Sequence, residues 1–218
     1  MRLYFIRHGK TTWNLESRYQ GAGGDSPLLA TSYSEIRQAG FFLREQSFAH
    51  VYASPIKRAR VTASKLLTAM NVKVPLSLDN RLEEFHLGQL EGMKFTDAAA
   101  AYPQVFDNFR NHPDQYDPTE IGGESYAEVV ARMRQKIFEI TANFENSQQI
   151  LLVSHGAALT ALINSLLQVP MADWRKRGGL GNTSTTILET LDHGQTFSLI
   201  AWNQTNYLNR PLETSDLI

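Results

Sequence analysis

Two histidine-containing tripeptides, Arg7-His8-Gly9 and Ser154-His155-Gly156, each follow an apolar run that has the pattern of a buried strand. The two runs are residues 2–6 and 150–153. In an open α/β sheet, the residues just past the carboxyl ends of the strands line the ligand crevice. If the two strands are neighbours, both imidazoles therefore face one pocket.

The first tripeptide contains residue types that suit phosphoryl transfer. A neutral imidazole is a nucleophile toward phosphorus when a hydrogen bond holds its other nitrogen, and the guanidinium of Arg7 can bind phosphoryl oxygens. Gly9 allows the backbone to turn sharply beside the ring of His8. Taken alone, the tripeptide is equally compatible with a structural histidine at a strand end.

Two predicted helix starts add candidate anion-binding positions. Ser54-Pro55 indicates an N-cap followed by proline at the first helical position, which places Arg58 in the first turn. A cation there opposes the helix macrodipole, so Arg58 is easier to explain when an anion is bound. Alone, His155 would be a core or cap residue, but its match with His8 favours a shared ligand.

An acidic segment, residues 81–92, supplies a candidate proton donor. A phosphoester leaving oxygen needs a proton, and a carboxyl group beside the phosphate can provide it when burial and anionic neighbours raise its pKa. Glu83 and Glu84 are adjacent, and adjacent residues of an extended segment face opposite ways. Only one of the two can therefore serve.

The elements that must position these residues alternate along the chain. Hydrophobic period and turn residues predict strands at 2–7, 49–54, 150–154, 184–191 and 196–202, and helices at 33–48, 55–70, 125–145 and 156–168. The alternation predicts parallel strands with crossover helices on both faces, and a turn at 192–195 predicts an antiparallel edge strand. We expect an α/β fold: a three-layer α/β/α sandwich on a mostly parallel, mixed sheet.

The length of 218 residues fits a single domain, residues 1–218. Ser125 and Glu128 predict a capping box at the start of the third helix. Residues 93–123 are less regular and rich in aromatic residues, and we expect them to form an insertion that covers the active site. Their aromatic rings could form an apolar lid that selects substrates, or simply the small core beneath the insertion.

Composition excludes several classes of protein. Apolar residues make up 42% and charged residues 20%, and no stretch approaches the roughly 20 apolar residues that span a bilayer. A formal net charge of -1 excludes the broad basic field of a non-specific nucleic-acid binder. The chain has no cysteine, and no basic-then-apolar leader precedes the first strand, so we expect a cytoplasmic protein.

The order and spacing of these elements resemble the histidine phosphatase superfamily, the phosphoglycerate mutase-like proteins. The resemblance runs from residue 1 to about 205. It is carried by Arg7-His8-Gly9, Asn14, Arg58, Glu84-Phe85-His86-Leu87-Gly88 and Ser154-His155-Gly156. It implies the superfamily's α/β/α fold and no metal or other cofactor.

The resemblance also implies a role for each matched residue. His8 resembles the nucleophile that becomes phosphorylated, and Glu84, rather than Glu83, resembles the proton donor. The remaining implied catalytic residues, which form the phosphate pocket, are Arg7, Arg58 and His155. The implied phosphate or substrate contacts are Asn14, Gln20, Gly21 and Gly156.

Three features depart from the family pattern and leave these catalytic residues unchanged. Lys10 stands where glutamine or glutamate is usual, residues 22–24 are one residue longer than usual, and Glu35 replaces a frequent glycine. Lys10 either adds positive charge near the mouth of the pocket or points to solvent.

Together these observations predict a metal-independent phosphomonoesterase that acts on small molecules, with His8 as nucleophile and Glu84 as general acid and base. The alternative is a cofactor-dependent phosphoglycerate mutase. Such mutases carry a longer, charged insertion, whereas residues 93–123 are compact and Gly122-Gly123-Glu124-Ser125 resembles the phosphatase branch. A third possibility is a catalytically silent phosphate-binding module, which the intact set of site residues disfavours. Nothing in the sequence indicates an oligomeric state.

Overall fold

The computed structural model describes residues 1–217, which contain one six-stranded sheet with the strand order β3-β2-β4-β1-β5-β6. The strands are β1 (Arg2–Arg7), β2 (Phe48–Ala53), β3 (Leu76–Leu78), β4 (Gln149–Ser154), β5 (Thr185–Glu189) and β6 (Ser198–Gln204). The strands β1 to β4 pair in parallel, and β5 and β6 add an antiparallel side. The predicted mixed sheet with an antiparallel edge is confirmed.

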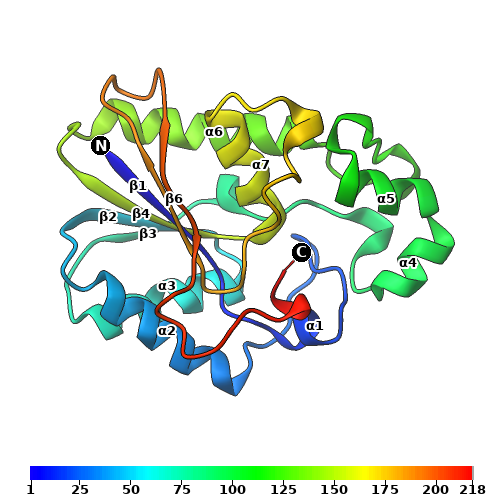
Figure 1. Ribbon diagram of the computed structural model, residues 1–218, viewed down its shortest axis with the longest axis horizontal. Helices are drawn as coiled ribbons and strands as arrows, with labels where there is room; N and C mark the ends of the chain where they lie inside the picture. Colours follow the sequence, from blue (N-terminus) through cyan, green and yellow to red (C-terminus); the bar gives the residue numbers. More distant parts are fainter. Residues whose placement is uncertain (218) are drawn as a thin grey trace.

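Helices cover both faces of the sheet (Figure 1). On one face lie α2 (Ala30–Leu43) and α3 (Lys57–Met70), and on the other lie α6 (Tyr126–Asn143) and α7 (Gly156–Leu166). Each layer has its own apolar cluster, because central strands covered on both faces bury side chains in both directions. The three-layer α/β/α sandwich is as predicted. Within residues 1–217, no helix is long and apolar enough to cross a membrane.

The register of the two central strands positions the candidate site. Arg7 at the end of β1 pairs with Ser154 at the end of β4, and every side chain from Leu3 to Arg7 is buried. Because the strands are parallel and end together, the residues that follow them emerge at the same edge of the sheet.

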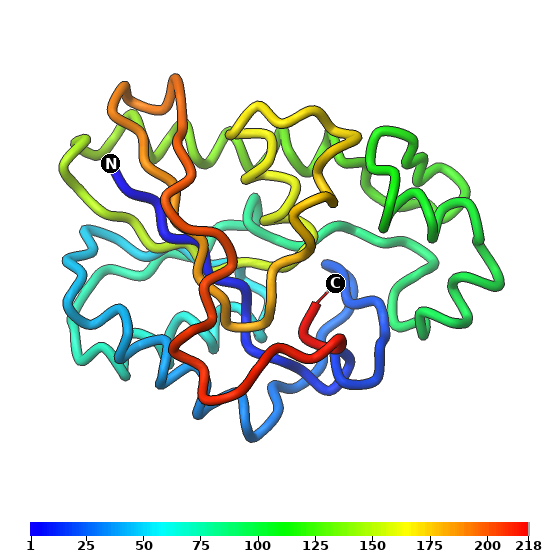
Figure 2. Tube along the Cα trace, viewed as in Figure 1, coloured from blue at the N-terminus to red at the C-terminus, as the bar shows by residue number. Residues whose placement is uncertain are grey.

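Residues 93–123 form a lobe of short helices at one side of the α6 layer, drawn in green in Figure 2. The lobe contains α4 (Phe95–Ala101) and α5 (Pro103–Asn111). Phe109 is 1% exposed and packs against Phe85, Tyr116 and Tyr126. This ring therefore belongs to the main core on that face.

Several boundaries differ from prediction. The helix α3 begins at Lys57 rather than at residue 55, because the hydroxyl of Ser54 contacts His155 and accepts only the amide of Ile56. The helix predicted at 33–48 occupies 30–43, since Phe48 is buried as the first residue of β2. The short edge strand β3 was missed because its leucines are largely exposed and show no strand pattern. The capping box of Ser125 and Glu128 is confirmed.

After β6, the C-terminal segment returns to the edge of the sheet where β1 ends. Drawn in red in Figure 1, it passes α2 and ends near α1 (Thr12–Leu15).

Candidate active site

The rings of His8 and His155 meet at the shared edge of β1 and β4. Their centroids lie 5.2 Å apart, and both side chains are buried. The expectation that the two strands are neighbours is confirmed, and it brings the two imidazoles side by side.

The contacts of His8 define its protonation. Its Nδ1 lies 2.8 Å from the carbonyl oxygen of Gly9, which can only accept, so Nδ1 carries the hydrogen. Its Nε2 accepts a hydrogen bond of 3.2 Å from Nε of Arg58. Burial, followed by the charges of Arg58 and Arg7, holds the pKa of His8 well below its ordinary value. His8 is therefore neutral, with the lone pair on Nε2.

The backbone at His8 is fixed by residues that the sequence analysis missed. Nδ2 of Asn182 donates to the carbonyl oxygen of His8 at 3.1 Å, and the amide of Gly9 donates to Oγ1 of Thr62 at 3.1 Å. Asn182 precedes β5 and is fully buried. A polar residue just ahead of an apolar strand was the only signal in the sequence.

Arg58 lies in the first turn of α3, as expected, and is almost fully buried. Its terminal nitrogens donate to the carbonyl oxygens of Gln20, Gly21 and Gly24 and to the carboxylate of Asp25. Arg58 thus holds the loop 20–25 against α3 and directs only Nε at His8.

Arg7 is fully buried beside the start of α7. Its Nη1 donates to the carbonyl oxygens of Leu180 at 2.6 Å and Asp216 at 2.5 Å. Its Nε and Nη2 are buried without a hydrogen-bond partner in the described chain. A Cβ atom at Gly156 would lie 3.0 Å from Nε, so glycine at this position admits the guanidinium. Burial lowers the pKa of Arg7 to about 10, which leaves it charged at neutral pH.

The carboxylate of Glu84 lies at the N-terminus of α7. It accepts the amides of Ala157 at 3.0 Å, Ala158 at 2.7 Å and Phe85 at 3.1 Å. Burial raises the pKa of Glu84 above its ordinary value, although these hydrogen bonds and Arg58 act in the opposite direction. Glu84, rather than Glu83, is the acid that the structure brings to the site.

Arg132 on α6 supports this acid from outside the pocket. It donates to the carbonyl oxygens of Glu83 at 2.8 Å and Glu84 at 2.9 Å, and its Nε pairs with Glu124 at 2.7 Å. Nothing in the sequence indicates this role for Arg132, because a charged residue in an amphipathic helix gives no sign of such contacts.

His155 presents one nitrogen to Ser54 and the other to the pocket. Its Nε2 lies 2.8 Å from Oγ of Ser54, while Nδ1 is buried without a partner in the described residues. Burial, together with the charge of Arg58, holds the pKa of His155 well below its ordinary value. Ser54 is therefore a ring-orienting residue and not the expected helix cap.

The secondary contacts predicted from the sequence differ in what they can offer. Oδ1 of Asn14 accepts from Thr11, and Nε2 of Gln20 is buried without a partner in residues 1–217. The amide of Gly21 donates to Glu91 at 2.9 Å, so in this geometry it is not available to phosphate. Gly156 serves through its lack of a side chain, as described above.

One small cavity reaches Glu84, but Arg7, His8 and His155 do not line it. This cavity of about 10 Å³ adjoins Glu84 and Gln20 and is walled by Phe95 and Phe109 of the insertion. This volume corresponds to about one water molecule. Among the described residues, no group of three or more His, Cys, Asp or Glu side chains is arranged to hold a metal ion.

Comparisons with known proteins give a consistent result. The family model described as histidine phosphatase superfamily (branch 1) matches residues 3–205. A protein of Erwinia tasmaniensis named "Probable phosphoglycerate mutase GpmB" is 35% identical over 199 residues, which cover 89% of this chain and 86% of that protein. Glucosyl-3-phosphoglycerate phosphatase of Mycobacterium tuberculosis is 33% identical over 213 residues, and the match covers 92% of this chain and 91% of that protein.

A solved structure supports the same relationship. That of Bacillus stearothermophilus YhfR superposes with a TM-score of 0.85 at 31% identity, and the match covers 93% of this chain and 96% of that one.

Proposed function

Because the chain belongs to the histidine phosphatase superfamily, an enzyme family with phosphatases and phosphoglycerate mutase-like members, we propose that it hydrolyses phosphomonoesters through a phosphohistidine on His8. The observation that carries this proposal is a set of buried polar atoms, on residues beside His8 or Arg58, that have no partner within residues 1–217. They are Nε and Nη2 of Arg7, Nδ1 of His155 and Nε2 of Gln20. Leaving such atoms unpaired costs about 1–3 kcal/mol each, and a phosphoryl group supplies acceptor oxygens for them.

The first step uses the tautomer that the contacts define. Nε2 of His8 attacks phosphorus while the bond from phosphorus to the ester oxygen breaks, and the carboxyl group of Glu84 donates its proton to that oxygen. The raised pKa of Glu84 keeps the proton available, and the lowered pKa of His8 keeps the ring neutral. Nε of Arg58, which donates to Nε2 of His8 in the unliganded site, must turn to the phosphoryl oxygens as Nε2 attacks. The alcohol leaves and the phosphoryl group stays on His8.

The second step reverses the proton transfer. The carboxylate of Glu84 accepts a proton from water as the water oxygen attacks phosphorus, and the bond between phosphorus and Nε2 breaks. Arg7, Arg58 and His155 surround the transferred group, so positioning and charge stabilisation do most of the work, as in phosphoryl transfer generally. Inorganic phosphate and neutral His8 result.

The nature of the relatives guides the choice of substrates. One relative is named for glucosyl-3-phosphoglycerate and another for phosphoglycerate, so small phosphorylated organic acids belong in the first panel. We propose a small phosphomonoester as substrate.

A second candidate function is a cofactor-dependent phosphoglycerate mutase, which the 35% identity to the Erwinia tasmaniensis protein favours. A mutase would return the phosphoryl group from His8 to a second substrate oxygen and protect it from water.

One assay separates these functions. Phosphate release from a varied phosphomonoester panel with excess chelator is measured beside 3-phosphoglycerate isomerisation with and without 2,3-bisphosphoglycerate, with His8→Ala as the blank. We expect chelator-resistant release that depends on His8. Bisphosphoglycerate-dependent isomerisation with little release would instead identify a mutase, and silence in both assays would identify a binding module. Release by His8→Ala at a near-normal rate would refute the nucleophile.

A further inference from the structure

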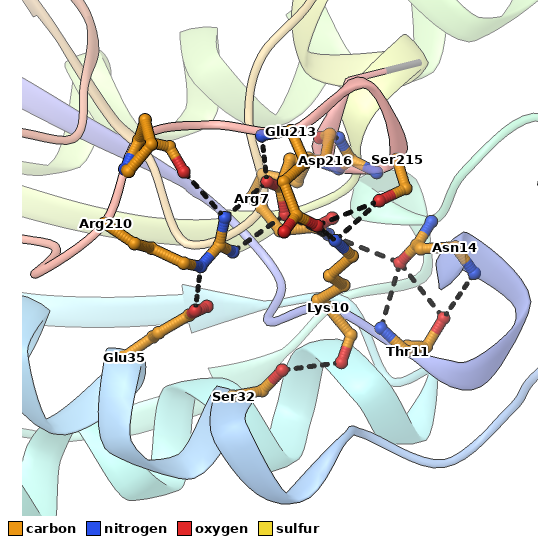
Figure 3. A network of polar contacts seen from close by, with 12 residues as sticks. Arg7, Lys10, Thr11, Asn14, Ser32, Glu35, Arg210, Glu213, Ser215 and Asp216 are labelled. Carbon is orange, nitrogen blue, oxygen red and sulfur yellow. Dashed lines mark hydrogen bonds and ion pairs between the residues drawn. The ribbon is translucent and has the colours of Figure 1, made fainter.

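The last residues of the described chain contact Arg7, a residue of the proposed phosphate pocket. We call residues 208–217 the C-terminal strap. The carbonyl oxygen of Asp216 accepts Nη1 of Arg7 at 2.5 Å and the amide of Asn182 at 3.2 Å. The strap therefore contacts Arg7, which Figure 3 shows beside Asp216, and Asn182, which holds the backbone of His8.

Two departures from the family pattern, Lys10 and Glu35, lie in the network that fastens this strap. Nζ of Lys10 lies 3.2 Å from Oδ1 of Asp216 and 2.9 Å from the carboxylate of Glu213. Lys10 is only 4% exposed, so it does not point to solvent. Arg210 binds Asp216 through both terminal nitrogens, at 2.6 and 2.9 Å, and reaches Glu35 at 2.6 Å (Figure 3).

The strap is held mainly by charge. Beyond Leu208, Asp216 is its only buried residue within the described chain, whereas Thr214 and Leu217 are exposed. Burial acts to raise the pKa of Asp216, but Arg210, the amide of Glu213 and Lys10 together lower it below its ordinary value. A buried carboxylate is costly unless it is fully paired, so loss of one partner weakens the whole attachment.

The attachment determines the orientation of Arg7. With Nη1 tied to two carbonyl oxygens, the guanidinium plane is fixed and the edge formed by Nε and Nη2 faces the pocket. A planar guanidinium binds phosphoryl oxygens best when its plane is preset. Without the strap, only Leu180 would hold this nitrogen.

We propose that the C-terminal strap completes the phosphate pocket by orienting Arg7, so that Lys10 and Asp216 are positioning residues for phosphoryl binding. This inference rests on the proposed function, since it requires Arg7 to bind the phosphoryl group. A short segment held by ion pairs can open locally without unfolding the core.

Docking of the strap and binding of phosphate must each favour the other. If the docked strap improves phosphate binding, phosphate must stabilise the docked strap by the same factor. Hydrogen exchange at the strap reports docking directly, because the amide of Asn182 donates to the carbonyl oxygen of Asp216 at 3.2 Å and the amide of Asn209, in the strap, donates to Oε1 of Gln38 at 3.4 Å.

The test compares Lys10→Met, Lys10→Arg and Asp216→Asn with wild type, and uses Lys65→Met as the matched control. Lys65 is exposed on α3 and forms no ion pair within residues 1–217. For each full-length variant, kcat and KM for the best substrate, inhibition by inorganic phosphate, and hydrogen exchange of the strap with and without phosphate are measured.

We expect Lys10→Met to weaken inhibition by inorganic phosphate and to lower kcat/KM, each by about tenfold, while strap exchange accelerates. Asp216→Asn keeps the backbone carbonyl oxygen that accepts from Arg7 but removes the side-chain charge. It should also weaken phosphate inhibition, lower kcat/KM and accelerate strap exchange. Lys10→Arg should restore most of the loss, and Lys65→Met should match wild type. Phosphate should slow strap exchange in wild type.

Either of two results would overturn the inference. Lys10→Met and Asp216→Asn could leave strap exchange unchanged, or they could accelerate it without weakening phosphate inhibition. In both cases, phosphate release by the wild-type protein would show that the proposed function holds although the inference about the strap fails. If wild type releases no phosphate and phosphate leaves strap exchange unchanged, the proposed function fails and the inference fails with it.

Discussion

Nε of Arg58 donates a hydrogen bond of 3.2 Å to Nε2 of His8, so a fixed positive charge faces the nitrogen that we propose as the nucleophile. This contact keeps the imidazole from taking a proton and marks the direction from which a phosphoryl group would approach. Because Gly9 holds the opposite nitrogen at 2.8 Å, the ring cannot exchange tautomers without losing that contact.

The pH dependence of kcat/KM follows from this pair and from Glu84. His8 must be neutral and its pKa is lowered, whereas Glu84 must be protonated and its pKa is raised. Activity should therefore persist at a pH below the ordinary range of histidine and decline as rising pH removes the proton of Glu84. A pH profile measured with a substrate whose own ionisation is known checks this. A profile that keeps rising through neutral pH would contradict the assignment of Glu84.

Glu84→Gln should damage poor leaving groups most. We expect a loss of about 10²–10⁴-fold in kcat for alkyl phosphates and a much smaller loss for activated aryl phosphates, whose oxygen needs no proton. Glu83→Gln is the matched control, because the side chain of Glu83 is half-buried and makes no hydrogen bond or ion pair within residues 1–217. This variant should leave both rates unchanged. Equal losses for the two substrate types would show that Glu84 does not protonate the leaving group.

The catalytic residues of this site could be predicted from the sequence, whereas most of the residues that hold them in place could not. His8 and His155 could be placed together because each follows a buried strand, and Arg7 pairs with Ser154 at the ends of those two strands. Arg58 could be identified because a cation in the first turn of a helix is locally unfavourable.

The residues that hold the catalytic side chains in place do so through contacts between distant segments. A local sequence pattern does not encode such contacts. Asp216 and Asn182 approach Arg7 and His8 from the far end of the chain, and Ser54 turns toward His155 instead of capping a helix. Lys10 was left with two interpretations, and the structure excludes solvent exposure. Such long-range pairing is fixed by tertiary packing, not by spacing.

Phe109→Ala should destabilise the protein without altering the order of substrate preference. The ring is 1% exposed and lies among Phe85, Tyr116 and Tyr126, so its removal should cost about 3–5 kcal/mol of unfolding free energy. Phe106 is half-buried, and Phe106→Ala should cost less. Chemical denaturation and a repeated substrate panel test this. A changed substrate ranking at wild-type stability would instead support the proposal that the insertion is a selective lid.

Acid should destabilise the unliganded protein through its two buried histidines. In the unfolded chain both bind protons below the ordinary pKa of 6.5, whereas in the fold both pKa values are well below it. Above pH 6.5 the two histidines should therefore not reduce the free energy of unfolding. Below pH 6.5 that free energy should fall by about 1.4 kcal/mol per histidine for each pH unit. Thermal denaturation of wild type and His155→Gln checks this, since the variant should show a shallower decline. Parallel curves would mean that His155 is protonated in the fold.

Gly156→Ala tests the geometry of Arg7 without touching a charged group. Alanine favours the helix, but its Cβ would lie 3.0 Å from Nε and 3.2 Å from Cζ of Arg7, so the guanidinium must shift by a few tenths of an ångström. Because bidentate phosphate binding depends on that placement, inhibition by inorganic phosphate should weaken by about tenfold while the melting temperature stays near that of wild type. Gly23→Ala is a suitable control, since its Cβ would meet Glu91 only at an ordinary contact distance of 3.4 Å. Phosphate inhibition equal to wild type would show that Arg7 tolerates displacement, and would argue against a phosphate clamp formed by its Nε edge.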